Sequence, residues 1–197
     1  MKFEKIGVLL VALLGFSMAL AQTARAADLP NQAGYCTKHG GVVQTRIPEY
    51  NTNGGTALVL AGQAQFCQFT AKKGGSQINV LLSTLTTTQP SLAALAYYAE
   101  VQLGSCNGNP ASCYCTLLGG SDSFGGINAA GGGWVLSTDP TDVLEACIFP
   151  DMSSIDSWGL AYHSMGIIRG KNLANVLRYA NPNAAAKADR NGSASPF

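Results

Sequence analysis

Residues 147–166, C-I-F-P-D-M-S-S-I-D-S-W-G-L-A-Y-H-S-M-G, predict a strand that carries a cysteine, a Pro-Asp turn and an aromatic helix. A diverged copy of this stretch occurs earlier in the chain. There, Cys67-Gln68-Phe69 repeats the C-x-F of residues 147–149, and Leu95-Ala96-Tyr97 repeats residues 160–162 after an inserted segment. These matches predict an internal repeat.

A second shared block lies upstream of each copy. Residues 35–41, Y-C-T-K-H-G-G, match residues 114–120, Y-C-T-L-L-G-G. A short helix should end at each Gly-Gly pair, because glycine adopts the left-handed conformation that ends many helices. We therefore interpret the chain as two related small modules of the α+β class. Each module would consist of a short helix, an antiparallel β-hairpin and a following helix, fastened by a disulfide.

The six cysteines predict a disulfide framework, because an even number of cysteines in an exported protein is paired by default. The repeat narrows the possible pairings, since two cysteines stand at equivalent places in each module, 31 positions apart in the first and 32 in the second. The two cysteines left over lie in the connector and would close a short loop. The predicted pairs are Cys36 with Cys67, Cys115 with Cys147, and Cys106 with Cys113.

The N-terminus has the features of a secretory signal peptide, which we place at residues 1–26. Lys2 and Lys5 precede an apolar run, and A-x-A signals at residues 19–21 and 24–26 leave two cleavage sites open. The run is shorter than the ~20 residues that cross a membrane, so no transmembrane segment is expected after leader removal. Removing three positive charges and one negative changes the formal net charge from +1 to −1. We expect a secreted or periplasmic bacterial protein that does not bind nucleic acid.

The remaining chain divides into three parts. Residues 27–105 form the diverged first module, with an inserted segment and an apolar helix, and residues 106–180 form the second module. Residues 181–197 are small, polar and without periodicity, which predicts a disordered tail.

Periodicity, turn residues and capping residues predict the individual elements. In the last long helix, Ile155, Trp158, Tyr162 and Met165 recur at helical spacing, which indicates a face that packs in the core. Expected helices are residues 33–39, 92–103 capped by Ser91, 110–118 capped by Asn109, 155–166 capped by Ser153 or Ser154, and 173–179; expected strands are residues 42–47, 56–60, 65–70, 77–84, 134–136 and 143–149.

Groups suited to catalysis are few. His39 and His163 are the only histidines. A Ser-His-Asp site would need His163 together with a distant aspartate such as Asp122 or Asp151. Cys36 and His39 have zinc-like spacing, but the repeat assigns Cys36 to a disulfide. We therefore predict no catalytic residue, no metal site and no cofactor.

The second module contains several short motifs in a fixed order: N-P-A-S at 109–112, Cys115, Gly119-Gly120, C-I-F-P-D at 147–151 and Trp158. With these motifs, residues 109–166 resemble the hemolysin-labelled domain family of small exported bacterial proteins, a domain family of unknown function. The family pattern would make the first module a diverged copy. Typical members have two further cysteines, at places that here fall on Ile155 and about Met165, and a glycine in place of Met152. The resemblance implies no catalytic residues.

These observations favour a non-enzymatic exported protein that binds a protein or another component of the cell envelope. We expect the binding site to be an exposed aromatic patch formed by Trp134, Phe124, Tyr98 and Tyr162. The alternative functions are a membrane-active protein and, with less support, a hydrolase that uses His163.

Overall fold

One curled antiparallel sheet organises the fold in the computed structural model, which describes residues 29–122 and 130–181 of the chain. The strand order is β6-β5-β1-β3-β4-β8-β7, and β2 pairs with the far end of β1. The expected signal peptide and almost all of the expected tail lie outside the described residues. The strands are β1 (Val42–Tyr50), β2 (Leu58–Val59), β3 (Ala64–Thr70), β4 (Gln77–Leu81), β5 (Gly132–Leu136), β6 (Asp139–Leu144), β7 (Ala146–Ile148) and β8 (Ser154–Asp156).

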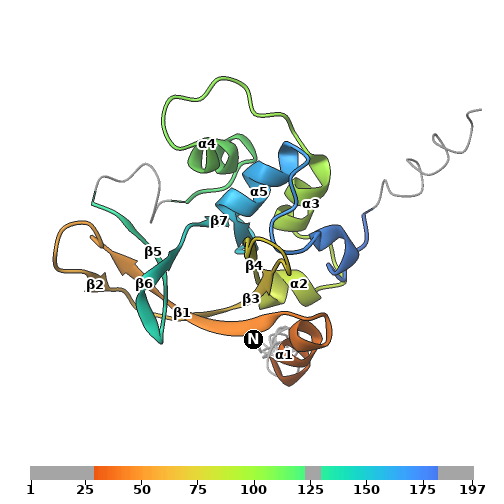
Figure 1. The fold of residues 1–197 in the computed structure, drawn as a ribbon, viewed down its shortest axis with the longest axis horizontal. Helices are drawn as coiled ribbons and strands as arrows, with labels where there is room; N and C mark the ends of the chain where they lie inside the picture. Colours follow the sequence, from red (N-terminus) through yellow and green to blue (C-terminus); the bar gives the residue numbers. More distant parts are fainter. Residues whose placement is uncertain (1–28, 123–129, 182–197) are drawn as a thin grey trace, which may run out of the picture.

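Most of the helices gather at one end of this sheet. Figure 1 shows α2, α3, α4 and α5 grouped beside β4 and β7, with the β5–β6 hairpin at the opposite end of the long strand β1. The helices are α1 (Leu29–Lys38), α2 (Leu82–Thr86), α3 (Leu92–Ala99), α4 (Pro110–Leu117), α5 (Ser157–Ser164) and the 3₁₀ turn η1 (Leu173–Asn175).

Strand β3 carries apolar side chains on both of its faces. Cys67 and Phe69 alternate with Phe66, and alternate residues of a strand point to opposite faces of the sheet. Cys67 and Phe69 belong to the main core, which they share with helix residues such as Tyr97 and Leu160. Phe66 belongs to a smaller cluster on the other face, with Leu144 and Ala146. Both faces of the sheet are therefore buried at this strand, which explains why its sequence alternates so weakly.

Two helices end in the same way, each beside a disulfide. The amide of Gly41 donates to the carbonyl oxygen of Cys36 at 3.0 Å, and the amide of Gly120 donates to that of Cys115 at 2.9 Å. Gly40, the first glycine of the first pair, has a φ of 82°, a left-handed backbone conformation that glycine adopts more easily than other residues. At the second glycine of each pair, an added Cβ would overlap the sulfur atoms of the adjacent disulfide. The Gly-Gly pairs are thus required both by backbone conformation and by the closeness of the sulfurs.

The three disulfides and two of the expected helix caps match the sequence predictions. The bonds join Cys36 to Cys67, Cys115 to Cys147, and Cys106 to Cys113. The Ser91 side chain accepts a hydrogen bond from Ala94 at the start of α3, and Asn109 accepts one from Ala111 at the start of α4.

The sheet crosses the expected boundary between residues 105 and 106. Strand β5 pairs with β1, and Pro48 lies opposite Trp134. Strand β8 pairs with β4 through Val80 and Ile155. The expected strand 143–149 is divided between β6, which pairs with β5, and β7, which pairs with β8. The strands therefore make one sheet rather than two separate hairpins.

Several element boundaries also differ from those expected. Helix α1 begins at Leu29 rather than at residue 33, and β1 continues to Tyr50. The expected strand 77–84 becomes β4 followed by α2. Helix α3 ends at Ala99, because Glu100 has a left-handed φ of 48°. Only the η1 turn forms within the expected helix 173–179.

The largest difference concerns the last long helix. Residues 154–156 form β8, so Ile155 is buried in a strand, and α5 begins at Ser157. Its cap is Asp156 rather than Ser153 or Ser154. Met165 follows the helix and is 58% exposed, so the expected core stripe does not extend that far.

We predict that Gly120→Ala lowers the free energy of unfolding by about 1 to 3 kcal/mol, because the new methyl group would displace the Cys115–Cys147 sulfurs. Gly104→Ala is the matched control, since its added Cβ would meet no atom within 4 Å. Urea denaturation of the oxidised proteins measures both changes. Equal stability of the two variants would contradict the packing explanation.

Candidate binding surface

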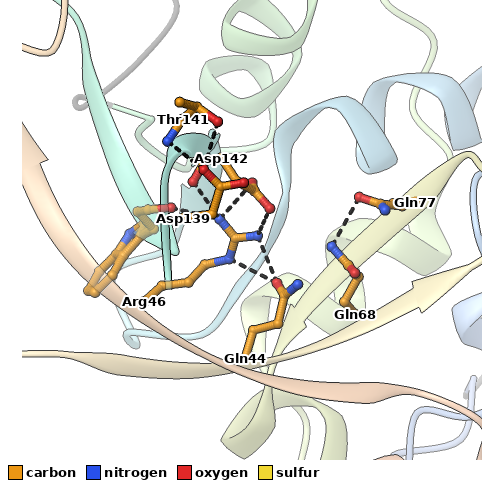
Figure 2. A network of polar contacts seen from close by, with 8 residues as sticks. Gln44, Arg46, Gln68, Gln77, Asp139, Thr141 and Asp142 are labelled. Atoms are coloured by element: carbon orange, nitrogen blue, oxygen red, sulfur yellow. Dashed lines mark hydrogen bonds and ion pairs between the residues drawn. The ribbon is translucent and has the colours of Figure 1, made fainter. Parts of the chain in front are cut away.

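The most deeply buried charged group is Arg46, and its contacts are structural. Figure 2 shows its guanidinium between Gln44 and Asp142. The Nη1 and Nη2 atoms donate to the two Asp142 carboxylate oxygens at 3.0 and 3.1 Å, and Nη1 also donates to the Trp134 carbonyl oxygen at 2.9 Å. The Nε atom donates to Gln44 at 3.0 Å. This network joins β1 to the β5–β6 hairpin, and the guanidinium has partners on all three of its nitrogens.

The three described members of the expected aromatic patch, Trp134, Tyr98 and Tyr162, have different surroundings. Trp134 packs against Phe66 on the sheet, with ring centroids 5.7 Å apart. Tyr98 is buried, its hydroxyl donates to the Tyr179 carbonyl oxygen at 2.6 Å, and burial raises its pKa. Phe124 lies outside the described residues. Of the four, Tyr162 lies in a surface depression along α5.

His163 lies against α3 rather than beside an aspartate. Its ring stacks on that of Tyr97 with centroids 3.8 Å apart, and its Nε2 lies 3.6 Å from the Glu100 carboxylate. Burial raises the pKa of Tyr97 to about 12, and its hydroxyl contacts Asn172 and the amide of Leu173. These contacts tie the C-terminal end of α5 to α3 and to the η1 turn.

Asp151 and Asp122, the two aspartates considered for a hydrolytic site, have other surroundings. The Asp151 carboxylate accepts from the amides of Leu92 and Ser153, so it holds the start of α3. Asp122 is buried next to the undescribed segment 123–129. The carboxylate that lies beside His163 is that of Glu100.

The depression along α5 and the loop that comes after it is shallow, with a volume of about 470 Å³. Trp158 and Tyr162 stand one helical turn apart, with ring centroids separated by 5.9 Å. The Arg169 guanidinium lies over the Tyr162 ring, 5.3 Å from its centroid. We define the α5 surface as Trp158, Tyr162, Met165, Ile167, Ile168 and Arg169.

The apolar side chains of the α5 surface are exposed because of how α5 ends. Gly166 adopts a left-handed φ of 77°, and the amide of Ile167 returns to the Tyr162 carbonyl oxygen at 2.9 Å. The chain then leaves the core, so Ile167 and Ile168 are 49% and 42% exposed, beside Met165. Single exposed apolar residues are common, and we take these three as a candidate surface because they lie within four positions next to an aromatic depression.

The loop that carries these residues is held against the β3–β4 turn. The amide of Gly170 donates to Ser76 Oγ at 3.3 Å, and an added Cβ at Gly170 would overlap the Phe69 carbonyl oxygen. Lys171 donates to the carbonyl oxygen of His39 and lies over the Phe69 ring. The loop therefore has a defined position, and Ser76 of the turn lines the depression.

Asp156 lies beneath this surface as the cap of α5. It is buried, and its Oδ1 accepts from the Gly159 amide at 2.8 Å. Burial raises the pKa of this carboxyl, while the Gly159 amide and the charge of Arg169 oppose that shift. Asp156 therefore links the start of α5 electrostatically to the guanidinium on the α5 surface.

The sequence interpretation missed Ile167, Ile168 and Arg169 as surface residues. Their signal is the pattern I-I-R-G-K at 167–171, in which an apolar pair precedes basic residues around a glycine, directly after the end of the expected helix 155–166. Among the described residues, no group of three or more His, Cys, Asp or Glu side chains is arranged to hold a metal ion.

No family model, curated protein or solved structure matches the chain. The resemblance to the hemolysin-labelled family therefore stays a prediction. Within residues 29–122 and 130–181, the helices are all too short or too polar to span a bilayer.

We predict that Asp142→Asn destabilises the fold by about 1 to 2 kcal/mol, because Arg46 would keep its charge in a buried position. The Asp142 side chain is 36% exposed, so the loss should be smaller than for a fully buried pair. Asp139→Asn in the same hairpin is the control and should cost less, because the hydrogen bonds of the Asp139 side chain within the described part of the chain go to Thr141. Urea denaturation at low and high salt tests this, and equal losses would contradict it.

We also predict that Asp156→Asn removes a pH dependence of stability. The pKa of Asp156 in the folded protein lies above the ordinary value of 3.8. The carboxyl therefore ionises less readily in the folded than in the unfolded protein, and stability falls as the pH rises from about 3.8 through the folded-state pKa. Asparagine keeps the helix cap without the charge. The variant should gain stability relative to wild type between pH 4 and pH 7 in urea denaturation. A difference that stays constant with pH would contradict the prediction.

Proposed function

We propose that the mature chain is an exported, non-enzymatic protein that binds a component of the bacterial cell envelope through the α5 surface. The observation that carries this proposal is the exposure of Met165, Ile167 and Ile168 beside the aromatic depression. Burying exposed apolar area contributes about 25 cal/mol per Å², so these side chains favour contact with another surface. The three disulfides support export, because such bonds persist in oxidising compartments.

The alternative functions use the same region differently. A membrane-active protein is favoured by the exposed aliphatic side chains of the α5 surface. A hydrolase would need His163 as a base, but its ring stacks on Tyr97 and lies beside Glu100, which supports a role in packing. We therefore place binding first and catalysis last.

We further propose that the chain arose from two copies of one α+β module. The strand register beside each of the two disulfides that close long loops, Cys36–Cys67 and Cys115–Cys147, supports this origin. Val42 pairs with Gln68, and Ser121 pairs with Ile148. In both halves, the residue after the Gly-Gly pair therefore lies opposite the residue after the second cysteine of the disulfide.

The order of the strands gives a second line of support. Cys67 lies opposite Val80, Cys147 lies opposite Ile155, and Val80 pairs with Ile155. In the first copy, β1 pairs with β3 and β3 pairs with β4. The second copy has the corresponding segments in reverse order across the sheet: β8, which pairs with β4, then β7, then Ser121. Equivalent positions thus meet at the middle, as expected for two copies related by a local twofold axis.

The helices fit the same relationship and revise the alignment of the repeat. Helix α1 packs against α2, and α4 packs against α5. Leu85 in α2 and Leu160 in α5 each follow the paired strand residue by five positions, and both are buried. Leu85, rather than Leu95, is therefore the better counterpart of Leu160.

The binding proposal predicts that Ile168→Asp weakens co-sedimentation of the purified protein with isolated bacterial envelopes by at least tenfold, because a charge would replace an exposed apolar contact. Leu117→Asp is the matched control, since Leu117 is 51% exposed at the end of α4 and the change in charge is the same. Circular dichroism checks that both variants are folded. Equal binding by Ile168→Asp and wild type would exclude the α5 surface.

A further inference from the structure

Basic residues lie on both segments that border the α5 surface. Arg169 and Lys171 follow the exposed isoleucines, and Lys72 and Lys73 are exposed in the β3–β4 turn against which this loop is held. Neither residues 70–77 nor residues 165–179 contain an aspartate or a glutamate. The α5 surface and the two segments beside it therefore contribute four basic residues, on a chain whose net charge is −1 after the expected removal of the leader.

The carboxylates on neighbouring elements do not neutralise this charge at the surface. Glu100 lies at the end of α3, where it faces His163. Asp156 is buried at the start of α5, and its raised pKa reflects that burial. Among the described residues, Arg169 forms no salt bridge, and its guanidinium rests on the Tyr162 ring at the edge of the depression.

Exposed aliphatic side chains surrounded by basic residues match the interface of an anionic bilayer. Aliphatic and aromatic side chains enter the boundary between headgroups and acyl chains, while lysine and arginine bind the phosphates above it. The three aliphatic residues lie within four positions of one tightly held loop, so they could enter the bilayer together without unfolding. The aromatic rings of Trp158 and Tyr162 are amphipathic groups of the kind found at that depth.

We infer that the α5 surface docks the protein on a phospholipid bilayer that contains anionic headgroups. Ile167 and Ile168 enter the interface, Arg169, Lys72 and Lys73 contact the phosphates, and Lys171, which is held by the His39 carbonyl oxygen, adds its charge from behind the loop. This inference rests on the proposed function and names the envelope component as lipid rather than protein. The protein lies on the bilayer and does not cross it.

The test is co-sedimentation with phosphatidylcholine vesicles prepared with and without phosphatidylglycerol. Wild type should bind only the vesicles with phosphatidylglycerol, and binding should weaken as salt screens the charges. Ile168→Asp should abolish this binding, whereas Leu117→Asp should leave it unchanged. The double variant Lys72→Gln, Lys73→Gln should lose about fivefold in affinity for each lysine, and it does not alter the apolar contacts.

Three results would overturn the inference: no binding of wild type to anionic vesicles, equal binding to neutral vesicles, or equal binding by Ile168→Asp. If wild type ignores vesicles but still binds envelopes in a manner that Ile168→Asp abolishes, the partner is an envelope component other than a phospholipid bilayer. In that case the proposed function stands and the lipid assignment fails. If Ile168→Asp changes neither assay, both fail.

Discussion

The pairing of β4 with β8 is the contact on which the rest of the structure depends. Through Val80 and Ile155 it joins strands from the two halves of the chain into one sheet. It also brings the start of α5 over β4, where Gly159 lies so close to Ile78 that a side chain would overlap it. The helix, its exposed C-terminal loop and the basic β3–β4 turn then come together as one surface.

The parts of the fold that depend on neighbouring residues could be predicted from the sequence. The caps at Ser91 and Asn109 are short-range hydrogen bonds, and the Gly-Gly helix ends reflect the conformational freedom of glycine. The disulfide pairs could be predicted from the repeated spacing of the cysteines, because each bond closes a loop within one half of the chain.

The parts that depend on distant partners could not be predicted. Nothing near Trp134 indicates that β5 will pair with β1 and turn this ring toward Phe66. Ile155 has helical spacing with Trp158 in the sequence, but pairing with β4 and β7 draws residues 154–156 into a strand. The candidate surface on α5 could not be predicted for the same reason, since the exposure of Ile168 depends on where α5 ends.

The β4–β8 junction therefore connects the fold to the candidate site, while β1 and β5 pair across the same boundary elsewhere in the sheet. A disulfide stabilises each half, and the sheet pairing between the halves assembles the α5 surface from the β3–β4 turn and the loop after α5. The most direct test is a nuclear Overhauser spectrum of the oxidised, isotope-labelled protein. Our account predicts cross-strand contacts between the backbone protons of Val80 and Ile155. Their absence, with β3–β4 and β7–β8 contacts present, would contradict it.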